Sequence, residues 1–215
     1  MPLRCRRKWT TALSEVKPFD QRLRIAALRL FFLAAVPLIV FTRSAWLHPE
    51  WLFDILEVLG LTLIIAGVLG RFWAILYIGG RKNARIMQDG PYSVCRHPLY
   101  LFSTIGTIGF GLMLGSVVLT AVLGLVVFLI LSATAAREEA FLRSEFGAAY
   151  DEYAARVPRI LPRLSGFSTP QEATFNVATL RRNLMDALVF LSLIPIAELM
   201  EFVHESLTIP TLPIW

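Results

Sequence analysis

Long apolar runs separated by short polar segments make up most of the 215-residue chain. A helix needs roughly 20 apolar residues to cross the ~30 Å hydrocarbon core of a bilayer. Five runs are candidates on this basis: residues 25–42, 52–78, 99–114, 117–136 and 184–203. The fifth also contains Asp186, Pro195, Glu198 and Glu201, so it could equally lie in the interface or re-enter the membrane. The pattern predicts an all-α fold, a polytopic integral membrane helix bundle with about five transmembrane helices.

The break between the third and fourth runs is only two residues long, Gly115 and Ser116. A connection this short can only reverse the chain, so we expect an antiparallel helical hairpin whose two open ends meet at one membrane face. Beyond the fourth run, residues 140–156 place aromatic and charged side chains on opposite faces at helical spacing. We therefore expect a cytoplasmic amphipathic helix after the fourth membrane helix.

Three parts of the chain follow from this pattern. Residues 1–24 form a basic cytoplasmic N-terminal arm, residues 25–163 form the membrane core, and residues 164–215 form a C-terminal extension with the fifth membrane helix. Composition agrees, because 56% of the residues are hydrophobic, only 17% are charged, and the mean hydropathy is +0.61. These values exclude an ordinary soluble domain of this size.

The basic residues are concentrated on three polar segments. The chain has 21 Lys and Arg against 16 Asp and Glu, a formal charge of +5, and 18 of the 21 lie in residues 1–24, 79–98 and 137–183. Basic residues stay on the cytoplasmic side of membrane proteins, so we expect all three segments to face the cytoplasm. Topology and attraction to anionic lipids explain the basic arm better than nucleic-acid binding does. Cys5 and Cys95 fall on this side, where thiols stay reduced, and predict neither a disulfide nor a metal site.

The open ends of the predicted hairpin carry the residues suited to chemistry. One end has Arg96 and His97, and the other has the adjacent acids Glu138 and Glu139. Solvation in the headgroup layer explains Arg96 and His97 equally well. Two adjacent acids at the membrane boundary, near several arginines, resemble half of a cation site more than they resemble solvated residues.

Arg71 is the other informative charge. It lies about eight residues, roughly 12 Å, before the end of the second run, which is deeper than an arginine side chain can bridge to the headgroups. A charge at that depth is costly unless it faces protein, water or a ligand. Two interpretations stay open: a structural partner such as one of the glutamates, or an anionic group on a ligand.

Two signatures resemble the isoprenylcysteine carboxyl methyltransferase family and the related membrane phospholipid methyltransferases. The first is Gly90-Pro91-Tyr92 leading into Arg96-His97-Pro98-x-Tyr100. The second is Glu138-Glu139-x-x-Leu142, Phe146-Gly147-x-x-Tyr150-x-x-Tyr153 and Val157-Pro158-Arg159 with Pro162. The resemblance runs from about Gly67 to Pro162, a little under half of the chain. Many relatives have a glycine where this chain has Phe102. This difference leaves the shape of the pocket near the hairpin entrance, and therefore the identity of the acceptor, undecided.

The resemblance implies an integral membrane methyltransferase that binds S-adenosylmethionine on the cytoplasmic side and receives a lipophilic acceptor laterally from the lipid. By the same resemblance, these residues line the cofactor pocket: Tyr92, Arg96, His97, Tyr100, Glu138, Glu139, Tyr150 and Arg159. Methyl transfer to a carboxylate requires alignment and exclusion of water, with no metal or nucleophilic side chain. Arg71 would orient the acceptor, and Glu139 or its neighbour would act as the base if the acceptor is an amine.

Two other functions remain open from the sequence. Membrane sterol-type reductases, which use NADPH, are similar over the same hairpin, although they usually carry Asn where this chain has Leu99. A non-catalytic membrane subunit that keeps the fold is the other alternative. The acceptor and the oligomeric state are not predicted.

Overall fold

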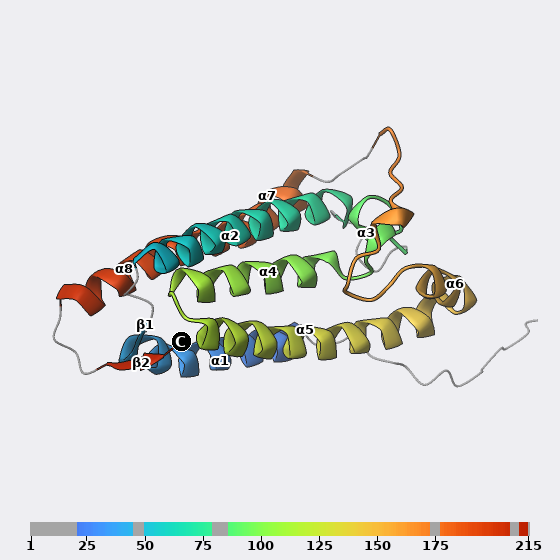
Figure 1. The fold of residues 1–215 in the computed structure, drawn as a ribbon. Helices are drawn as coiled ribbons and strands as arrows, with labels where there is room; N and C mark the ends of the chain where they lie inside the picture. The colour runs from blue at the N-terminus through green and yellow to red at the C-terminus, as the bar shows by residue number, and fades with distance from the viewer. Residues whose placement is uncertain (1–20, 45–49, 79–85, 173–176, 207–210, 215) are drawn as a thin grey trace, which may run out of the picture.

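The computed structural model describes residues 21–44, 50–78, 86–172, 177–206 and 211–214. Four helices form its body: α1 (Gln21–Phe41), α2 (Glu50–Ile78), α4 (Pro98–Met113) and α5 (Val117–Phe146). Helix α4 lies between α2 and α5, and α1 runs along α5 (Figure 1). Cys5 and most of the predicted basic arm fall outside the described residues, as do the basic positions of residues 79–85.

Shorter elements lie at the two ends and along one side of this body. Helices α3 (Pro91–Val94) and α6 (Ala148–Arg156) lie at one end (Figure 1). The parallel strands β1 (Thr42–Ser44) and β2 (Leu212–Ile214) lie at the other. The C-terminal helices follow α2, in the order α7 (Val177–Leu188), the 3-10 helix η3 (Val189–Ser192) and α8 (Leu193–Ser206), after a 3-10 turn η2 (Leu164–Gly166).

Three of the described helices are long and apolar enough to cross a membrane: α1, α2 and α5. The predicted third span corresponds to α4, which has 16 residues and is about 24 Å long, shorter than these three helices. Most of α4 is buried between α2 and α5, so its side chains contact protein and not lipid. The predicted fifth span is divided by η3 into helices of 12 and 14 residues, and neither is long enough alone.

Small residues allow α2 and α4 to pack backbone against backbone. A Cβ atom added at Gly109 would lie 2.6 Å from the carbonyl oxygen of Gly60, and one added at Gly60 would lie equally close to the carbonyl of Gly109. Gly67, two turns after Gly60 in α2, and Gly106, one turn before Gly109 in α4, make a second close approach. The glycine-rich run in α4 therefore serves helix packing in the membrane region.

The predicted reversal between the third and fourth runs is confirmed. Gly115 has a φ of +65°, which favours glycine, and the Ser116 side chain caps α5 by accepting a hydrogen bond from the Leu119 amide at 3.1 Å. Helix α5 does not end at residue 136 as the apolar run predicted, but continues to Phe146. Glu138 and Glu139 therefore lie inside a helix, away from the negative pole of its dipole.

The predicted amphipathic helix is built from two pieces. The last turns of α5 supply the first part, the chain breaks at Gly147 with a φ of +53°, and α6 supplies the second. Arg143 Nε donates to Asp151 Oδ1 at 2.9 Å across this break. The start of α1, the end of α2, the start of α4 and the end of α5 all lie at the end of the bundle that carries α3 and α6 (Figure 1).

The strand pair departs from the all-α expectation. Thr42, Arg43 and Ser44 pair in parallel with Leu212, Pro213 and Ile214. Strands of three residues are too short to show the alternation of apolar and polar positions by which a strand is predicted from sequence. Their effect is to join the end of α1 to the C-terminal extension.

Candidate functional site

Glu139 is the centre of an ion-pair network at the α3 and α6 end of the bundle. Its side chain is fully buried, and Arg159 donates to both of its oxygens, from Nε at 3.1 Å and from Nη2 at 2.8 Å. His97 Nε2 lies 3.2 Å from Oε1, and Arg96 Nη2 lies 3.3 Å from the same oxygen. Three of these contacts reach Oε1 and one reaches Oε2, so Oε1 is fully engaged and Oε2 keeps one acceptor position.

Backbone hydrogen bonds bring Arg96, His97 and Arg159 to this carboxylate. The amide of Arg96 donates to the carbonyl of Pro158 at 2.9 Å, and the amide of His97 donates to that of Arg159 at 3.0 Å. The Cys95 thiol donates to the carbonyl of Ile160 at 3.0 Å, and burial raises the pKa of this thiol to about 11. The two sequence signatures therefore lie side by side as extended chains, which fixes both arginines on the same acid.

His97 and Tyr100 form a stacked pair at the start of α4. Their ring centroids are 5.4 Å apart and the planes differ by 2°. His97 Nδ1 lies 3.7 Å from Glu138 Oε2, so the two ring nitrogens face the two adjacent acids. Arg24 of α1 donates to the Tyr100 hydroxyl at 2.9 Å and lies over the same ring. This contact ties α1 to the site.

Three tyrosines of the signatures are buried beside the network. The Tyr153 hydroxyl donates to the carbonyl of Tyr92 at 2.7 Å, and Tyr150 contacts Tyr153 edge to face at 6.0 Å. Burial raises the pKa of Tyr150 to about 12, and the negative charge of Glu139 adds to the rise. Burial is also the main cause of the raised pKa values of Tyr92 and Tyr153. All three phenols are therefore protonated at neutral pH and can donate hydrogen bonds.

Three buried polar atoms of this group have no hydrogen-bond partner among the described residues. They are the hydroxyls of Tyr92 and Tyr150 and the Nε of Arg96. Leaving a buried donor unsatisfied costs about 1–3 kcal/mol, so such atoms occur where a ligand or water completes the site. Each of the three can donate, which suits a ligand that presents oxygen or nitrogen acceptors.

Arg71 lies apart from this network, about one helical turn deeper. Its guanidinium donates to the Ser103 hydroxyl of α4 and lies 4.9 Å from the centroid of the Phe190 ring of η3. The Phe102 ring fills the space where a Cβ of Gly70 would be and contacts Trp73 edge on, at 6.5 Å between centroids. Phe102 therefore closes the side of the bundle near Arg71.

The structure gathers most of the residues proposed from the sequence. Those on the Glu139 network or next to it are Arg96, His97, Tyr100, Glu138, Glu139, Tyr150 and Arg159. Tyr92 joins them through Tyr153. Sequence reasoning missed Arg24, which was counted only as part of the basic arm, and Phe190, which lies outside the region of resemblance.

Three further acids meet near the start of α2, away from the Glu139 network. Glu57 of α2 and Glu198 and Glu201 of α8 bring their carboxylate oxygens within 4.8 Å of one another. The i, i+3 spacing of the two α8 acids was visible in the sequence, but their partner on α2 was not. Acidic side chains gather in this way without a metal ion, so the geometry alone assigns no ligand.

Comparison with known proteins places this site in context. A family model described as phospholipid methyltransferase matches residues 56–149. The cobalt-zinc-cadmium resistance protein CzcN of Cupriavidus metallidurans is 36% identical over 188 residues, covering 87% of this chain and 86% of that protein. The nickel-cobalt-cadmium resistance protein NccN of Alcaligenes xylosoxydans xylosoxydans is 32% identical over 200 residues, 93% of each chain.

A more distant similarity covers the site itself. The protein-S-isoprenylcysteine O-methyltransferase of Schizosaccharomyces pombe is 36% identical over 81 residues, which is 38% of this chain and 34% of that protein. Protein-S-isoprenylcysteine O-methyltransferase B of Arabidopsis thaliana is 31% identical over 113 residues, 48% of this chain and 57% of that protein. No solved structure matches the chain.

Proposed function

This chain belongs to the family of membrane methyltransferases that includes the isoprenylcysteine carboxyl methyltransferases and the phospholipid methyltransferases, and we propose that it methylates a lipophilic acceptor with S-adenosylmethionine. The methyl group goes to a carboxylate or an amine on an acceptor that arrives through the bilayer. The observation that carries the proposal is the buried Glu139 network with unsatisfied donors of Tyr150 and Arg96 beside it.

The donors around the network suit the polar parts of S-adenosylmethionine. The Tyr150 hydroxyl and Arg96 Nε would donate to its carboxylate or ribose, and Glu138 would meet its amino group. Tyr92, His97 and Tyr100 supply aromatic faces for adenine or the sulfonium. When bound, the cofactor supplies an activated methyl carbon, and this chain supplies alignment and exclusion of water.

Glu139 acts in this proposal as a positioning residue. Its two oxygens already meet Arg159, Arg96 and His97, so little room remains for a proton from an amine or for a cofactor group. Glu138 lies 3.7 Å from His97 and also interacts with the Tyr100 side chain, but 18% of its own side chain is exposed, whereas Glu139 is fully buried. If the acceptor is an amine, Glu138 is therefore the better placed base.

Arg71 is proposed to orient the acceptor. It lies on α2, and its guanidinium contacts Ser103, which is about one turn after Tyr100 in α4, and Phe190. An acceptor with a carboxylate or phosphate near the methylated atom would place that anion at Arg71. Phe102 and Trp73 would limit its bulk on this side. The distribution of basic residues supports a cytoplasmic location for the N-terminus and the cofactor site in this proposal.

A role in metal tolerance is a second proposal, at the level of physiology. It rests on the two metal-resistance proteins that match almost the whole length of this chain, whereas the isoprenylcysteine methyltransferases match about half of it or less. The test is growth in cobalt, zinc, cadmium or nickel of a strain that lacks the gene. Restored tolerance with the wild-type gene supports this role, and unchanged tolerance in the deleted strain overturns it.

Ligand binding to the detergent-solubilised protein tests the enzymatic proposal. S-adenosylhomocysteine should stabilise the protein saturably against heat, and NADPH should not. Tyr150→Phe should weaken S-adenosylhomocysteine roughly two- to tenfold, the value of one hydrogen bond. Tyr77→Phe is the matched control, because the Tyr77 hydroxyl bonds to Thr169 at 2.7 Å, outside the network. Stabilisation by NADPH alone would favour a reductase, and stabilisation by neither ligand would favour a non-catalytic subunit.

A further inference from the structure

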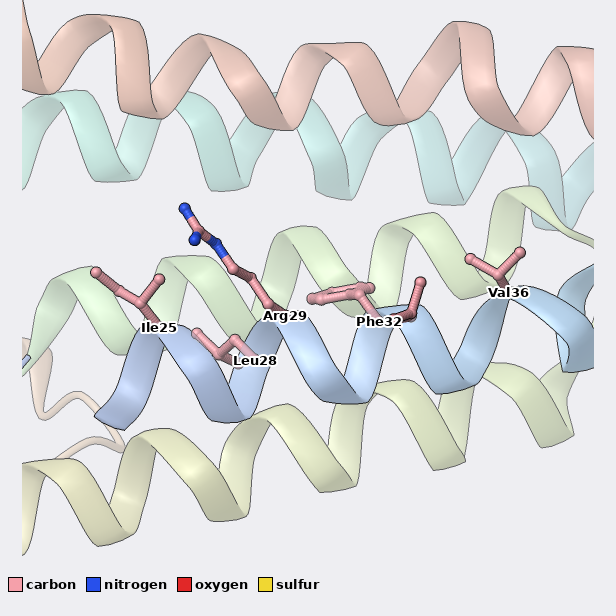
Figure 2. A pocket seen from close by; sticks show the side chains of 6 residues that line it. Ile25, Leu28, Arg29, Phe32 and Val36 are labelled. Atoms are coloured by element: carbon pink, nitrogen blue, oxygen red, sulfur yellow. The ribbon is translucent and has the colours of Figure 1, made fainter. Parts of the chain in front are cut away.

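A shallow groove follows α1 where the helix crosses the membrane. It has a volume of about 450 Å³ and is lined by Ile25, Leu28, Arg29, Phe32, Leu33 and Val36 (Figure 2). Five of these six side chains are apolar, and they recur at helical spacing, so the groove is a continuous apolar track with one positive charge. In Figure 2 the Arg29 guanidinium extends away from α1 above its apolar neighbours.

Arg29 has no partner in the part of the chain that the structure describes. No hydrogen bond, ion pair or ring contact reaches its guanidinium from residues 21–44, 50–78, 86–172, 177–206 or 211–214. The contrast within the same helix is Arg24, which donates to Tyr100 at 2.9 Å. An arginine on a membrane helix with no protein partner requires an anion or water, since the charge is otherwise costly there.

The depth of Arg29 suits a lipid phosphate. Arg29 lies four residues after Ile25, where the apolar run begins, which is about 6 Å along the axis, and five residues, about 7.5 Å, beyond Arg24. A long basic side chain at this depth can direct its charge back toward the headgroup layer. The phosphate of an adjacent lipid lies in that layer, and its acyl chain extends into the hydrocarbon beside the following turns.

We propose that the α1 groove binds an anionic phospholipid, with its phosphate paired to Arg29 and one acyl chain along Phe32, Leu33 and Val36. Charge complementarity selects the occupant, because the only charge on the apolar lining is positive. The site does not require methyl transfer and is independent of the proposed function.

The inner side of the groove is continuous with the functional site. Leu28 and Phe32 pack against the buried cluster of Tyr100, Val127, Leu131 and Ala135. Tyr100 is the residue that stacks on His97 and accepts a hydrogen bond from Arg24. A lipid held on α1 therefore supports the helix that buttresses Tyr100, so its binding should raise the thermal stability of the whole bundle.

The test compares lipids added to the delipidated, detergent-solubilised full chain. Phosphatidylglycerol should raise the unfolding temperature saturably and remain bound in native mass spectra, and phosphatidylcholine with the same acyl chains should do so much less. Arg29→Leu should weaken phosphatidylglycerol about fivefold, which corresponds to one arginine at a lipid surface, and Arg29→Lys should retain most of the affinity. Leu33→Trp, which fills the groove, should weaken both lipids.

Arg43→Leu is the matched control, because Arg43 is exposed at the opposite end of α1 and outside the groove. It should leave the preference for phosphatidylglycerol unchanged. Equal stabilisation by the two lipids, or a preference that survives Arg29→Leu, would overturn the proposal. An equal loss in Arg43→Leu would show a general effect of surface charge and would overturn it as well.

Discussion

Replacing Glu139 by glutamine should destabilise the protein more than any other single change in the network. Glutamine keeps the shape of the side chain but removes the charge that Arg96, His97 and Arg159 share. The carboxylate is fully buried, and the exposed fractions of the Arg96 and His97 side chains are only 10% and 9%. Neither group can regain full hydration when the negative charge is lost.

The magnitude follows from the burial of each partner. Removing one member of a buried ion pair costs about 3–5 kcal/mol, because an uncompensated charge remains inside. For a protein of this size, 1 kcal/mol shifts the melting temperature by about 2–4 °C, so Glu139→Gln should lower it by on the order of 10 °C. Arg159→Gln should cost about 1 kcal/mol or less, because 42% of the Arg159 side chain is exposed and solvent screens that pair.

Thermal unfolding in one detergent at one scan rate measures both variants. Glu138→Gln is the matched control, since it removes the adjacent charge, whose contact with His97 is longer, at 3.7 Å. The reasoning is wrong if Arg159→Gln or Glu138→Gln destabilises as much as Glu139→Gln. If Glu139→Gln keeps its melting temperature but loses affinity for S-adenosylhomocysteine, Glu139 touches the cofactor and is not a positioning residue.

Three further changes test other parts of the structure. Gly109→Ala should cost about 1–3 kcal/mol of unfolding free energy, because the new Cβ would lie 2.6 Å from the Gly60 carbonyl oxygen. Gly166→Ala is the control and should be tolerated, because its Cβ would lie 3.5 Å from its nearest neighbour. Equal effects of the two changes would contradict backbone packing of α2 on α4. Arg71→Leu should raise the KM for the acceptor about tenfold or more and leave S-adenosylhomocysteine affinity within twofold, and an unchanged KM would assign Arg71 to packing alone. In a Cys5→Ser background, the Cys95 thiol should react with iodoacetamide much more slowly in the folded than in the unfolded protein, because it is buried and its pKa is raised. Rapid labelling of the folded protein would exclude the contact between Cys95 and Ile160.

The hydrophobic pattern predicted the long helices well, because a membrane imposes their length directly. The hairpin at Gly115 followed from the same pattern and is confirmed. The third run already had the length of α4, 16 residues, but the pattern could not show that α4 is enclosed by α2 and α5. It gave residue 136 as the end of the apolar part of the fourth span, and α5 continues as an amphipathic helix to Phe146, which adds no apolar length.

The C-terminal extension was the least predictable part. Residues 184–203 have enough apolar residues for a span, but η3 interrupts the helix where Phe190 packs over Arg71. The strands β1 and β2 pair although most of the chain separates them in sequence. A strand of three residues is too short to show an alternation of apolar and polar positions that would predict this pairing. Both features depend on tertiary contacts, which a single sequence does not encode locally.

The composition of the site was predictable, but the assignment of roles within it was not. Sequence reasoning brought Glu138 and Glu139 together with Arg96 and His97 because the ends of a hairpin must meet. It treated the two acids as equivalent, although their helical positions differ by 100° and only Glu139 is fully buried. That rotation directs one carboxylate to Arg96, His97 and Arg159, so the two adjacent acids have different surroundings.

The unsatisfied groups indicate the polarity of the ligand. Once Glu139 is engaged by Arg159, Arg96 and His97, the buried polar atoms that lack a partner among the described residues include the Tyr150 hydroxyl and Arg96 Nε, both donors. A site whose open positions are donors selects a ligand rich in acceptors, and the carboxylate, ribose and adenine of S-adenosylmethionine all present acceptors toward such groups. The network therefore has two complementary parts. Glu139 contacts Arg96, His97 and Arg159, and the donors that remain at Arg96 Nε and the Tyr150 hydroxyl are the groups that we propose bind the cofactor.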